Sequence, residues 1–406
     1  MIAERPETLP SLPCKPPDTP GLAGSDGPCS HIRKETAMSS QAYTSTAAAF
    51  PRRIHSGFWP EGHVQGIAVD ESGGFIYYSF TTILLKTDLA GNPVGSVCNI
   101  VGHLGCITFD PDRRRVYGSL ELKHDAVGRG IVNRTGKELA EEDAFYLVSF
   151  DCDAIDRMGM DAEVTDGAGR SVMTALYLPD VVKDYTETDE VSGTLHRYGC
   201  SGIDGTAYGP VCGADADSEK RITVCYGVYG DVSRGDNDHQ VMLQYHPAMI
   251  DSLGRPLTQA APHHSGCPAE ARYFFYTGNT TYGVQNFEYD PFTRTYLTAV
   301  YTGRKETFTN YPLFFIDAAK APREGELVGR EGERGLLLTA ARPTPAVSEN
   351  GGCWFGLGQT GVYAFGDGRY AYSVQLDRRE DGKRMQASEV VLYRLDGDGE
   401  SVFTEL

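Results

Sequence analysis

Residues 63–97 contain four short apolar runs, and this pattern recurs along the chain. The runs span residues 64–69, 75–80, 83–87 and 94–97, and Gly, Asp, Asn, Thr and Pro residues separate them. Short runs rich in Ile, Val, Tyr and Phe with such boundaries are typical of β-strands joined by tight turns. Because one four-stranded sheet is too small to be stable alone, the segment predicts that further sheets pack against it.

Further copies of the pattern begin near residues 103, 200, 281 and 359. Their last candidate strands span residues 172–177, 273–276, 336–338 and 402–406. An Asp recurs in the first turn of three copies, as Asp70, Asp110 and Asp290. Residues 123–144 and 247–268 interrupt the spacing, and each is either a loop or the site of an additional strand.

Such repetition predicts an all-β fold, a β-propeller of about five four-stranded blades around an axial channel. The alternative is a pair of β-sandwiches of similar composition. Residues 1–50, rich in Pro, Ser and Thr, are predicted to be a disordered extension. Residues 51–406 are predicted to form a single propeller domain. Either the last strand, at 402–406, or the lead-in before residue 63 would complete the fifth blade.

Composition narrows the classes of partner. The chain has 406 residues, and 55 acidic against 37 basic side chains give a net charge of −18. This balance argues against nucleic acid or anionic lipid as the main partner. There is no apolar run long enough for a membrane span, no leader pattern, and no CxxC pair among the ten cysteines. We therefore expect a cytoplasmic monomer with reduced thiols that acts on a small polar ligand.

In a propeller, function concentrates in the loops at one opening of the channel. The candidate positions are therefore the residues just before and after the start of each innermost strand, and those after each second strand. The predicted catalytic residues are His63, His103, Glu121 and His124. The predicted substrate-binding residues are Gln65, Arg197, Tyr198, Asp204, Asn279, Asn286, Arg304 and Gln359.

Paired His and carboxylate groups perform acid–base chemistry near neutral pH. The first hypothesis is therefore a hydrolase or lyase for a carbohydrate- or lactone-like ligand in the axial funnel. The alternative is a non-catalytic propeller that binds a protein or peptide through rim aromatics. The candidates for that surface are Tyr229, Tyr311, Trp354 and Phe355.

Several side chains with oxygen ligands are expected near the same opening, and such ligands suit a divalent metal ion. Whether a metal binds there is left open, and no cofactor is assigned. Its candidate ligands are Asp204, Asp231, Asp236, Asp238, Asn279 and Asn286. The alternative is that Asp231, Asp236 and Asp238 belong to an ordinary acidic loop.

The first copy resembles a blade of the NHL, SMP-30/gluconolactonase and YWTD-type propellers. The resemblance rests on residues 65–70 (QGIAVD), 76–79 (IYYS) and 85–91 (LKTDLAG). This resemblance implies a β-propeller fold. The lactonases of that group hold a divalent metal through a Glu, Asn and Asp set, which cannot be placed here residue by residue, so their activity is not implied. Gln65-Gly66 is also similar to a Gln-Gly pair of the five-bladed plant-type glutaminyl cyclases.

Overall fold

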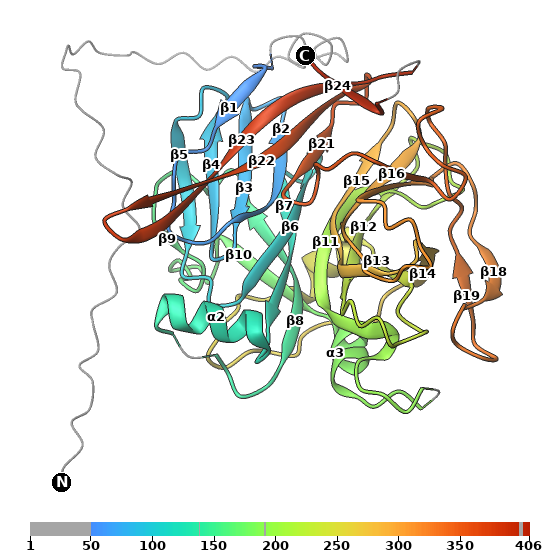
Figure 1. The fold of residues 1–406 in the computed structure, drawn as a ribbon. Coiled ribbons are helices and arrows are strands. Elements are labelled where there is room, and N and C mark those ends of the chain that lie inside the picture. The colour runs from blue at the N-terminus through green and yellow to red at the C-terminus, as the bar shows by residue number, and fades with distance from the viewer. Residues whose placement is uncertain (1–49, 138, 191, 398–400) are drawn as a thin grey trace.

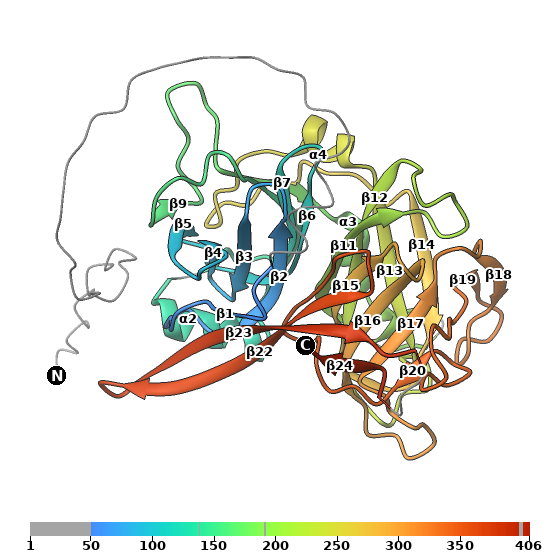
Figure 2. The same cartoon turned by 90° about the horizontal axis from the view of Figure 1, so that it is seen from above.

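Five β-sheets stand around a common axis as the blades of a propeller (Figures 1 and 2). The computed structural model describes residues 50–137, 139–190, 192–397 and 401–406. The predicted all-β propeller of five blades is confirmed. The extension predicted to be disordered, residues 1–50, lies outside the described residues except for Phe50.

Each blade is built on an antiparallel meander whose first strand lies nearest the axis. The first blade comprises β2 (Val64–Asp70), β3 (Phe75–Phe80), β4 (Ile83–Asp88) and β5 (Pro93–Cys98), with β9 (Met160–Asp161) added in parallel to β5. The second comprises β6 (His103–Asp110), β7 (Arg115–Leu122), β8 (Ala144–Asp151) and β10 (Met173–Tyr177). The third comprises β11 (Cys200–Pro210), β12 (Lys220–Val228), β13 (His239–Tyr245) and β14 (Ala271–Tyr276).

The last two blades follow the same order. The fourth comprises β15 (Thr280–Asp290), β16 (Thr295–Thr302), β17 (Leu313–Asp317) and β20 (Gly352–Cys353). The fifth comprises β21 (Val362–Ala364), β22 (Arg369–Glu380) and β23 (Lys383–Leu395). The β22–β23 hairpin is longer than the other hairpins and projects beyond the ring (Figure 2).

Helices occupy the connections between strands. The two interrupting tracts hold α2 (Ala126–Thr135) and α4 (Pro247–Leu253), while α3 (Pro179–Thr186) precedes the third blade. Both α2 and α3 lie on the lower side of the view in Figure 1. Among the described residues no helix is long and apolar enough to cross a membrane.

One predicted strand belongs to a different blade. Residues 336–338 were expected to form the outer strand of the fourth blade. They fall largely in β19 (Arg334–Leu337), which pairs in parallel with β14 of the third blade and antiparallel with β18 (Arg323–Glu326). The expectation was wrong because it followed sequence order, whereas the free edge of β14 was the available partner. The short β20 completes the fourth blade on β17.

Both ends of the propeller domain contribute to ring closure. The strand β1 (Arg53–His55) pairs with residues Glu389 to Val391 of β23, and β24 (Phe403–Glu405) pairs with Tyr393 to Leu395. The two alternatives for completing the fifth blade are therefore both realised, because β23 is long enough to hold both short strands. This pairing covers an edge that would otherwise expose unpaired backbone groups.

The hydrophobic core is divided into five clusters, each between neighbouring blades. The cluster between the fifth and first blades contains Ile54 and Trp59 from the lead-in, Tyr78 from β3 and Val390 from β23. Because both faces of every blade are buried in this way, the strands read as nearly continuous apolar runs. The lead-in thus stabilises the closure by hydrophobic packing as well as by strand pairing.

Glycines bring the innermost strands into contact at the axis. A Cβ atom at Gly66 would lie 2.8 Å from Ile107 N, and one at Gly205 would lie 2.7 Å from Val284 Cγ1. Asn286 on β15 crosses this waist, and its Nδ2 donates to the backbone oxygens of Gln65 at 2.7 Å and Gln359 at 3.0 Å. The channel is therefore filled at mid-height, and its two openings are separate.

The recurrent first-turn aspartates stabilise the turns at the far ends of the innermost strands. Asp70, Asp110 and Asp290 are fully buried. Each accepts hydrogen bonds from the backbone N–H groups that follow it, for example from Gly73 at 2.8 Å and Phe292 at 3.0 Å. Their recurrence has a structural cause, since an Asp side chain satisfies the backbone of a tight turn.

Candidate active site

The innermost strands begin on one face of the ring, which we call the N-face, and end on the opposite C-face. On the N-face, β6, β11 and β7 with the residue that follows it bring together the four residues that we call the N-face cluster: His103, Glu121, Lys123 and Asp204. His103 opens β6 and lies opposite Glu121 in the register with β7. Its Nδ1 lies 3.1 Å from Glu121 Oε2 and 3.6 Å from Asp204 Oδ1. One imidazole thereby joins carboxylates from two neighbouring blades.

The charged groups of the cluster shift one another's pKa values. Burial alone would lower the pKa of His103, but the Asp204 and Glu121 carboxylates raise it above its usual value. For Glu121 the balance is the reverse: burial would raise its pKa, while Lys123 and His103 lower it. These contacts favour the protonated form of His103 and the ionised form of Glu121. The ring Nε2 of His103 has no hydrogen-bond partner among the described residues, so its proton remains for a ligand.

Asp204 differs from Glu121 in its protonation. Burial raises the pKa of Asp204 to about 6, although the charge of His103 acts against this. Gln285 Nε2 donates to its Oδ2 at 3.1 Å, and Ser119 Oγ donates to its backbone oxygen at 2.8 Å. The side chain remains 13% exposed. A positioned carboxyl group with this pKa exchanges a proton near neutral pH, as general acid–base catalysis requires.

Lys123 holds Glu121 in place through an ion pair and links it to the third blade. Its Nζ lies 2.7 Å from Glu121 Oε2 and 3.5 Å from Asp125 Oδ2, and it donates to the backbone oxygen of Ser201 at 2.8 Å. Glu121, Lys123 and Asp125 alternate along the chain, and the structure brings their side chains together. Ile203 N also donates to Glu121 Oε1 at 2.7 Å. Glu121 and Lys123 therefore bind the second blade to the third as well as orienting His103.

His63 lies near His103 and has a different charge. Burial, followed by the charge of His103, lowers the pKa of His63 to about 4, so it is neutral near pH 7. Arg134 of α2 and Arg384 of the β22–β23 hairpin also act on it. Gln65 is buried beside it, and its Nε2 lies 3.5 Å from Thr81 Oγ1. These residues extend the polar surface toward the first blade.

Other predicted residues lie outside the N-face cluster. His124 is exposed, and its Nδ1 lies 3.0 Å from Asp143 Oδ1. Arg197 and Tyr198 both contact Glu333, in a network around the buried Arg330. The structure therefore does not bring these three predicted residues to the opening beside His103.

Three further predicted binders have backbone partners or face solvent. Asn279 Oδ1 accepts hydrogen bonds from the backbone N–H groups of Arg304, at 2.8 Å, and Lys305, at 3.3 Å. Gln359 Nε2 donates to the backbone oxygens of Val300 and Pro312, both at 3.2 Å. Arg304 itself is exposed. Like Asn286 at the waist, Asn279 and Gln359 stabilise the scaffold in this structure.

In the acidic loop considered as a divalent-metal site, Asp236 and Asp238 are paired with protein cations. Arg234 Nε lies 2.8 Å from Asp236 Oδ1, and Lys305 Nζ lies 2.7 Å from Asp238 Oδ1. Asp231 accepts from the Ser233 backbone N–H at 2.8 Å. In the described parts of the chain no group of three or more His, Cys, Asp or Glu side chains is arranged to hold a metal ion.

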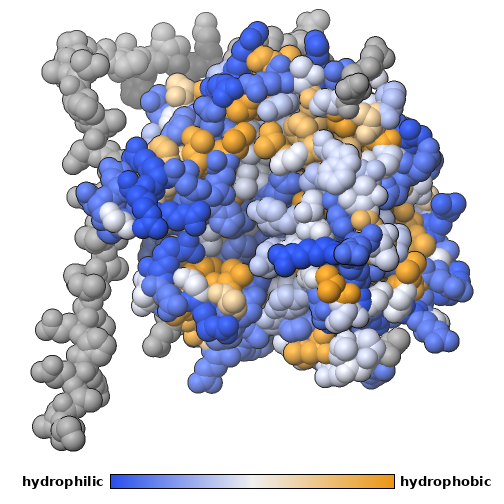
Figure 3. Space-filling model, in the orientation of Figure 1, coloured by the Kyte–Doolittle hydropathy of each residue, from blue (hydrophilic) through white to orange (hydrophobic). Residues whose placement is uncertain are grey.

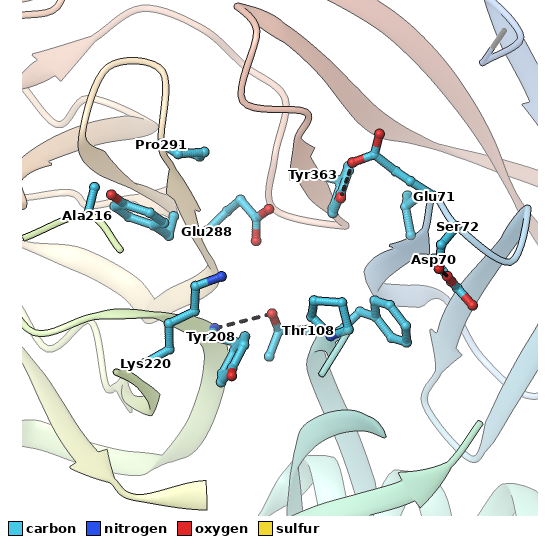
Figure 4. A pocket seen from close by; sticks show the side chains of 14 residues that line it. Asp70, Glu71, Ser72, Thr108, Tyr208, Ala216, Lys220, Glu288, Pro291 and Tyr363 are labelled. Atoms are coloured by element: carbon cyan, nitrogen blue, oxygen red, sulfur yellow. Dashed lines mark hydrogen bonds between the residues drawn. The ribbon is translucent and has the colours of Figure 1, made fainter. Parts of the chain in front are cut away.

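The sequence analysis did not identify a pocket on the C-face. This pocket has a volume of about 180 Å³ and lies where all five innermost strands end (Figure 4). Its polar side chains include Thr108, Lys220 and Glu288. The available signal was an acidic residue between the aromatic residues Phe287 and Tyr289, inside a strand that was otherwise expected to be apolar.

Comparisons with known proteins give structural likenesses alone. No protein-family model and no curated protein sequence matches the chain. A mutant of the alpha-L-arabinanase of Cellvibrio cellulosa is similar over 86% of this chain and 96% of that chain, at 12% identity and a TM-score of 0.38. A functionally unknown protein from Desulfotomaculum acetoxidans DSM 771 is similar over 87% of this chain and 75% of that chain, at 9% identity and a TM-score of 0.33.

Proposed function

We propose that the N-face cluster binds a small hydroxyl-rich molecule of the carbohydrate or lactone class and exchanges protons with it. The observation that carries the proposal is the meeting of His103 and Asp204, from different blades, at 3.6 Å beside the channel opening. Both side chains are nearly buried, with 10% and 13% of their surface exposed. Removal from water strengthens their action on a bound ligand.

The two groups have complementary roles. The His103 imidazolium donates a proton through Nε2 to a ligand oxygen, while Glu121 holds Nδ1. The Asp204 carboxylate accepts a proton from a ligand hydroxyl or from water. An acid and a base group whose surroundings shift their pKa values by different causes are the arrangement that hydrolases and lyases use. Neutral His63 and the amides of Gln65 and Gln285 are hydrogen-bonding groups that suit a polyhydroxylated ligand.

The test is a thermal-shift screen of pentoses, hexoses and aldonolactones on the wild-type protein and on Asp204→Asn and His103→Gln. His124→Ala is the matched control, because it removes another histidine–carboxylate pair that lies outside the cluster. A ligand at about a hundred times its Kd stabilises the folded state by about 2.7 kcal/mol. We expect this stabilisation in the wild type and in His124→Ala, and its loss in the two cluster variants.

Measuring the turnover of a ligand found in this screen tests whether the N-face cluster is catalytic. We expect kcat to fall by about a hundredfold or more in His103→Gln and Asp204→Asn, the usual scale for loss of a general acid or base. Full turnover in both variants would exclude the proposed proton transfer. Equal stabilisation by sugars in all four proteins would place the ligand elsewhere.

The alternative, a non-catalytic interaction scaffold, depended on a rim of four aromatic residues. Trp354 is 66% exposed and contacts Tyr311, with ring centroids 5.1 Å apart. Phe355 packs on Tyr372, and Tyr229 packs on His196. Of these four residues, Trp354 is the large side chain that is mainly exposed, while Phe355 and Tyr229 are half-buried. On the face drawn in Figure 3, hydrophobic residues form separate patches among hydrophilic ones. The N-face cluster therefore supports the first function better.

A further inference from the structure

The C-face pocket contains a buried acid that its neighbours satisfy only in part. Glu288 is 9% exposed, and its Oε1 accepts a hydrogen bond from Ala364 N at 3.0 Å. The second carboxyl oxygen has no hydrogen-bond partner among the described residues. Figure 4 shows the carboxyl group directed into the pocket, on the same side as Lys220 and Thr108. A polar group buried in this way costs free energy unless a ligand or water completes its bonding.

Two more hydrogen-bond donors point to the same space. Thr108 Oγ1 accepts from Tyr208 N at 3.2 Å, which leaves the hydroxyl proton to donate elsewhere. The Nζ of Lys220 lies 5.3 Å from the centre of the Tyr208 ring. Lys220 forms no ion pair with any described residue. An ammonium group without a carboxylate, beside a hydroxyl, is a site for an anionic oxygen.

The acidic residues that line the pocket are either paired with a cation or have raised pKa values, so they do not exclude an anion. Asp70 is paired with Arg114, whose Nη2 lies 2.9 Å from Asp70 Oδ2. Glu71 accepts a hydrogen bond from the Tyr363 hydroxyl at 2.8 Å, and burial raises the pKa of Glu71. Burial also raises the pKa of Glu288 to about 8, despite the Ala364 N–H and the charge of Lys220. At neutral pH Glu288 is thus mainly a carboxylic acid and a donor.

We propose that the C-face pocket is a second ligand site, which binds the carboxylate of a small organic acid through Lys220, Thr108 and Glu288. Aromatic and proline side chains provide the apolar wall for the body of the acid: Phe109, Pro111, Tyr208, Tyr289, Pro291 and Tyr363. The volume of about 180 Å³ lies below the ~300–1,000 Å³ typical of drug-sized ligands. The occupant is accordingly a short monocarboxylate. The filled waist separates this site from the N-face cluster.

The proposal predicts how binding depends on pH. The O–H of Glu288 donates to the bound carboxylate, so affinity is highest while Glu288 is protonated. Above about pH 8 the ionised Glu288 repels the ligand, and affinity falls. The titratable and charged groups around Glu288 come from seven strands and one turn: Asp70, Glu71, Cys106, Tyr208, Lys220, Tyr289, Asp290, Tyr296 and Tyr363. A cationic amine would show the opposite pH dependence, since ionised Glu288 would attract it.

The experiment measures thermal stabilisation of the full chain by acetate, butyrate and benzoate, each at about 10 mM, with benzylamine as the cationic comparison. The variants are Lys220→Met and Glu288→Gln. Lys320→Met is the matched control, because this lysine is 60% exposed on another blade and pairs with Asp317. We expect butyrate or benzoate to stabilise the wild type and Lys320→Met at about pH 6, and Lys220→Met to bind at least about tenfold more weakly.

Glu288→Gln supplies a second readout. The amide keeps a donor but does not titrate, so we expect binding to persist and to lose its decline above about pH 8. Three results would overturn the proposal: no stabilisation by any of the three acids, equal binding by Lys220→Met and the wild type, or stabilisation by benzylamine alone. Each result is independent of the N-face cluster, which the sugar screen tests.

Discussion

Asn286 of β15 and Gln65 of β2 come from blades on different sides of the axis, and Asn286 Nδ2 donates to the Gln65 backbone oxygen at 2.7 Å. Asn286 Oδ1 also accepts from Cys106 Sγ at 3.2 Å, and the same Nδ2 donates to the Gln359 backbone oxygen. One amide thus connects four of the five blades at the waist. Its removal leaves buried backbone oxygens without donors, which is more costly than the loss of an exposed hydrogen bond.

Asn286→Ala is therefore expected to lower the free energy of unfolding by roughly 2–4 kcal/mol. Asn92→Ala is the matched control, because Asn92 lies in an exposed turn and bonds Asp88 at 2.9 Å. Urea unfolding of both variants provides the comparison. Equal midpoints for the two variants would contradict a structural role for the axial amide.

Gly66→Ala tests the close approach of the inner strands. The new Cβ would lie 2.8 Å from Ile107 N and 2.9 Å from Cys106 Cα, so backbone must move, and we expect a loss of about 2 kcal/mol or more. Gly130→Ala in α2 is the control, because nothing lies within 4 Å of its added Cβ. That substitution should stabilise the helix by about 0.4–1 kcal/mol. Thermal melts that rank the two variants the other way would be inconsistent with a packed waist.

Glu288 should make stability depend on pH. Its pKa in the folded state, about 8, lies above the ordinary value of 4.5, so the folded protein retains this proton more strongly than the unfolded chain. The contribution is complete below about pH 4.5 and is lost as pH rises to about 8. Relative to Glu288→Gln, the wild type should lose roughly 3–5 kcal/mol across this range.

The measurement is the difference in unfolding free energy between the wild type and Glu288→Gln at several pH values, which cancels the other titrating groups. Glu349→Gln, at a side chain that is 88% exposed, serves as the control substitution. A difference that stays constant across the range would show that Glu288 is ionised in the folded protein at neutral pH.

Ring closure predicts unequal effects from neighbouring residues of β1. Ile54 is 3% exposed in the core between the fifth and first blades, whereas the side chain of Arg53 is 53% exposed. Ile54→Ala should cost about 2–4 kcal/mol, and Arg53→Ala at most about 1 kcal/mol. Chemical denaturation compares them. A small effect of Ile54→Ala would mean that β24 alone closes the blade.

Strand positions were predictable because their cause is local. Each strand alternates with turn residues, and the recurrent Asp70, Asp110 and Asp290 satisfy the turns that follow the innermost strands. The error at residues 336–338 arose where the partner was remote. Nothing in a four-residue strand indicates that it will pair in parallel with β14 of the third blade rather than join β17 of the fourth.

The candidate site was predictable only in part. Period-two alternation placed Glu121 and Lys123 together, and the same alternation separates His124 from them. The meeting of His103 with Asp204 depends on how the second blade packs on the third, so sequence distance carries no information about it. Glu288 was not predicted because the candidate residues came from the beginnings of the innermost strands, whereas its pocket lies at their ends.

By itself the sequence determined the strands, their turns, the number of repeats and the polar character of the N-face, because these follow from local hydrophobic periodicity and backbone preferences. The tertiary structure alone decided which polar residues meet. Blade packing closed the waist with Asn286 and divided the channel into two openings. It also set the protonation of Asp204 and Glu288, because pKa values depend on burial and on charges brought from other blades.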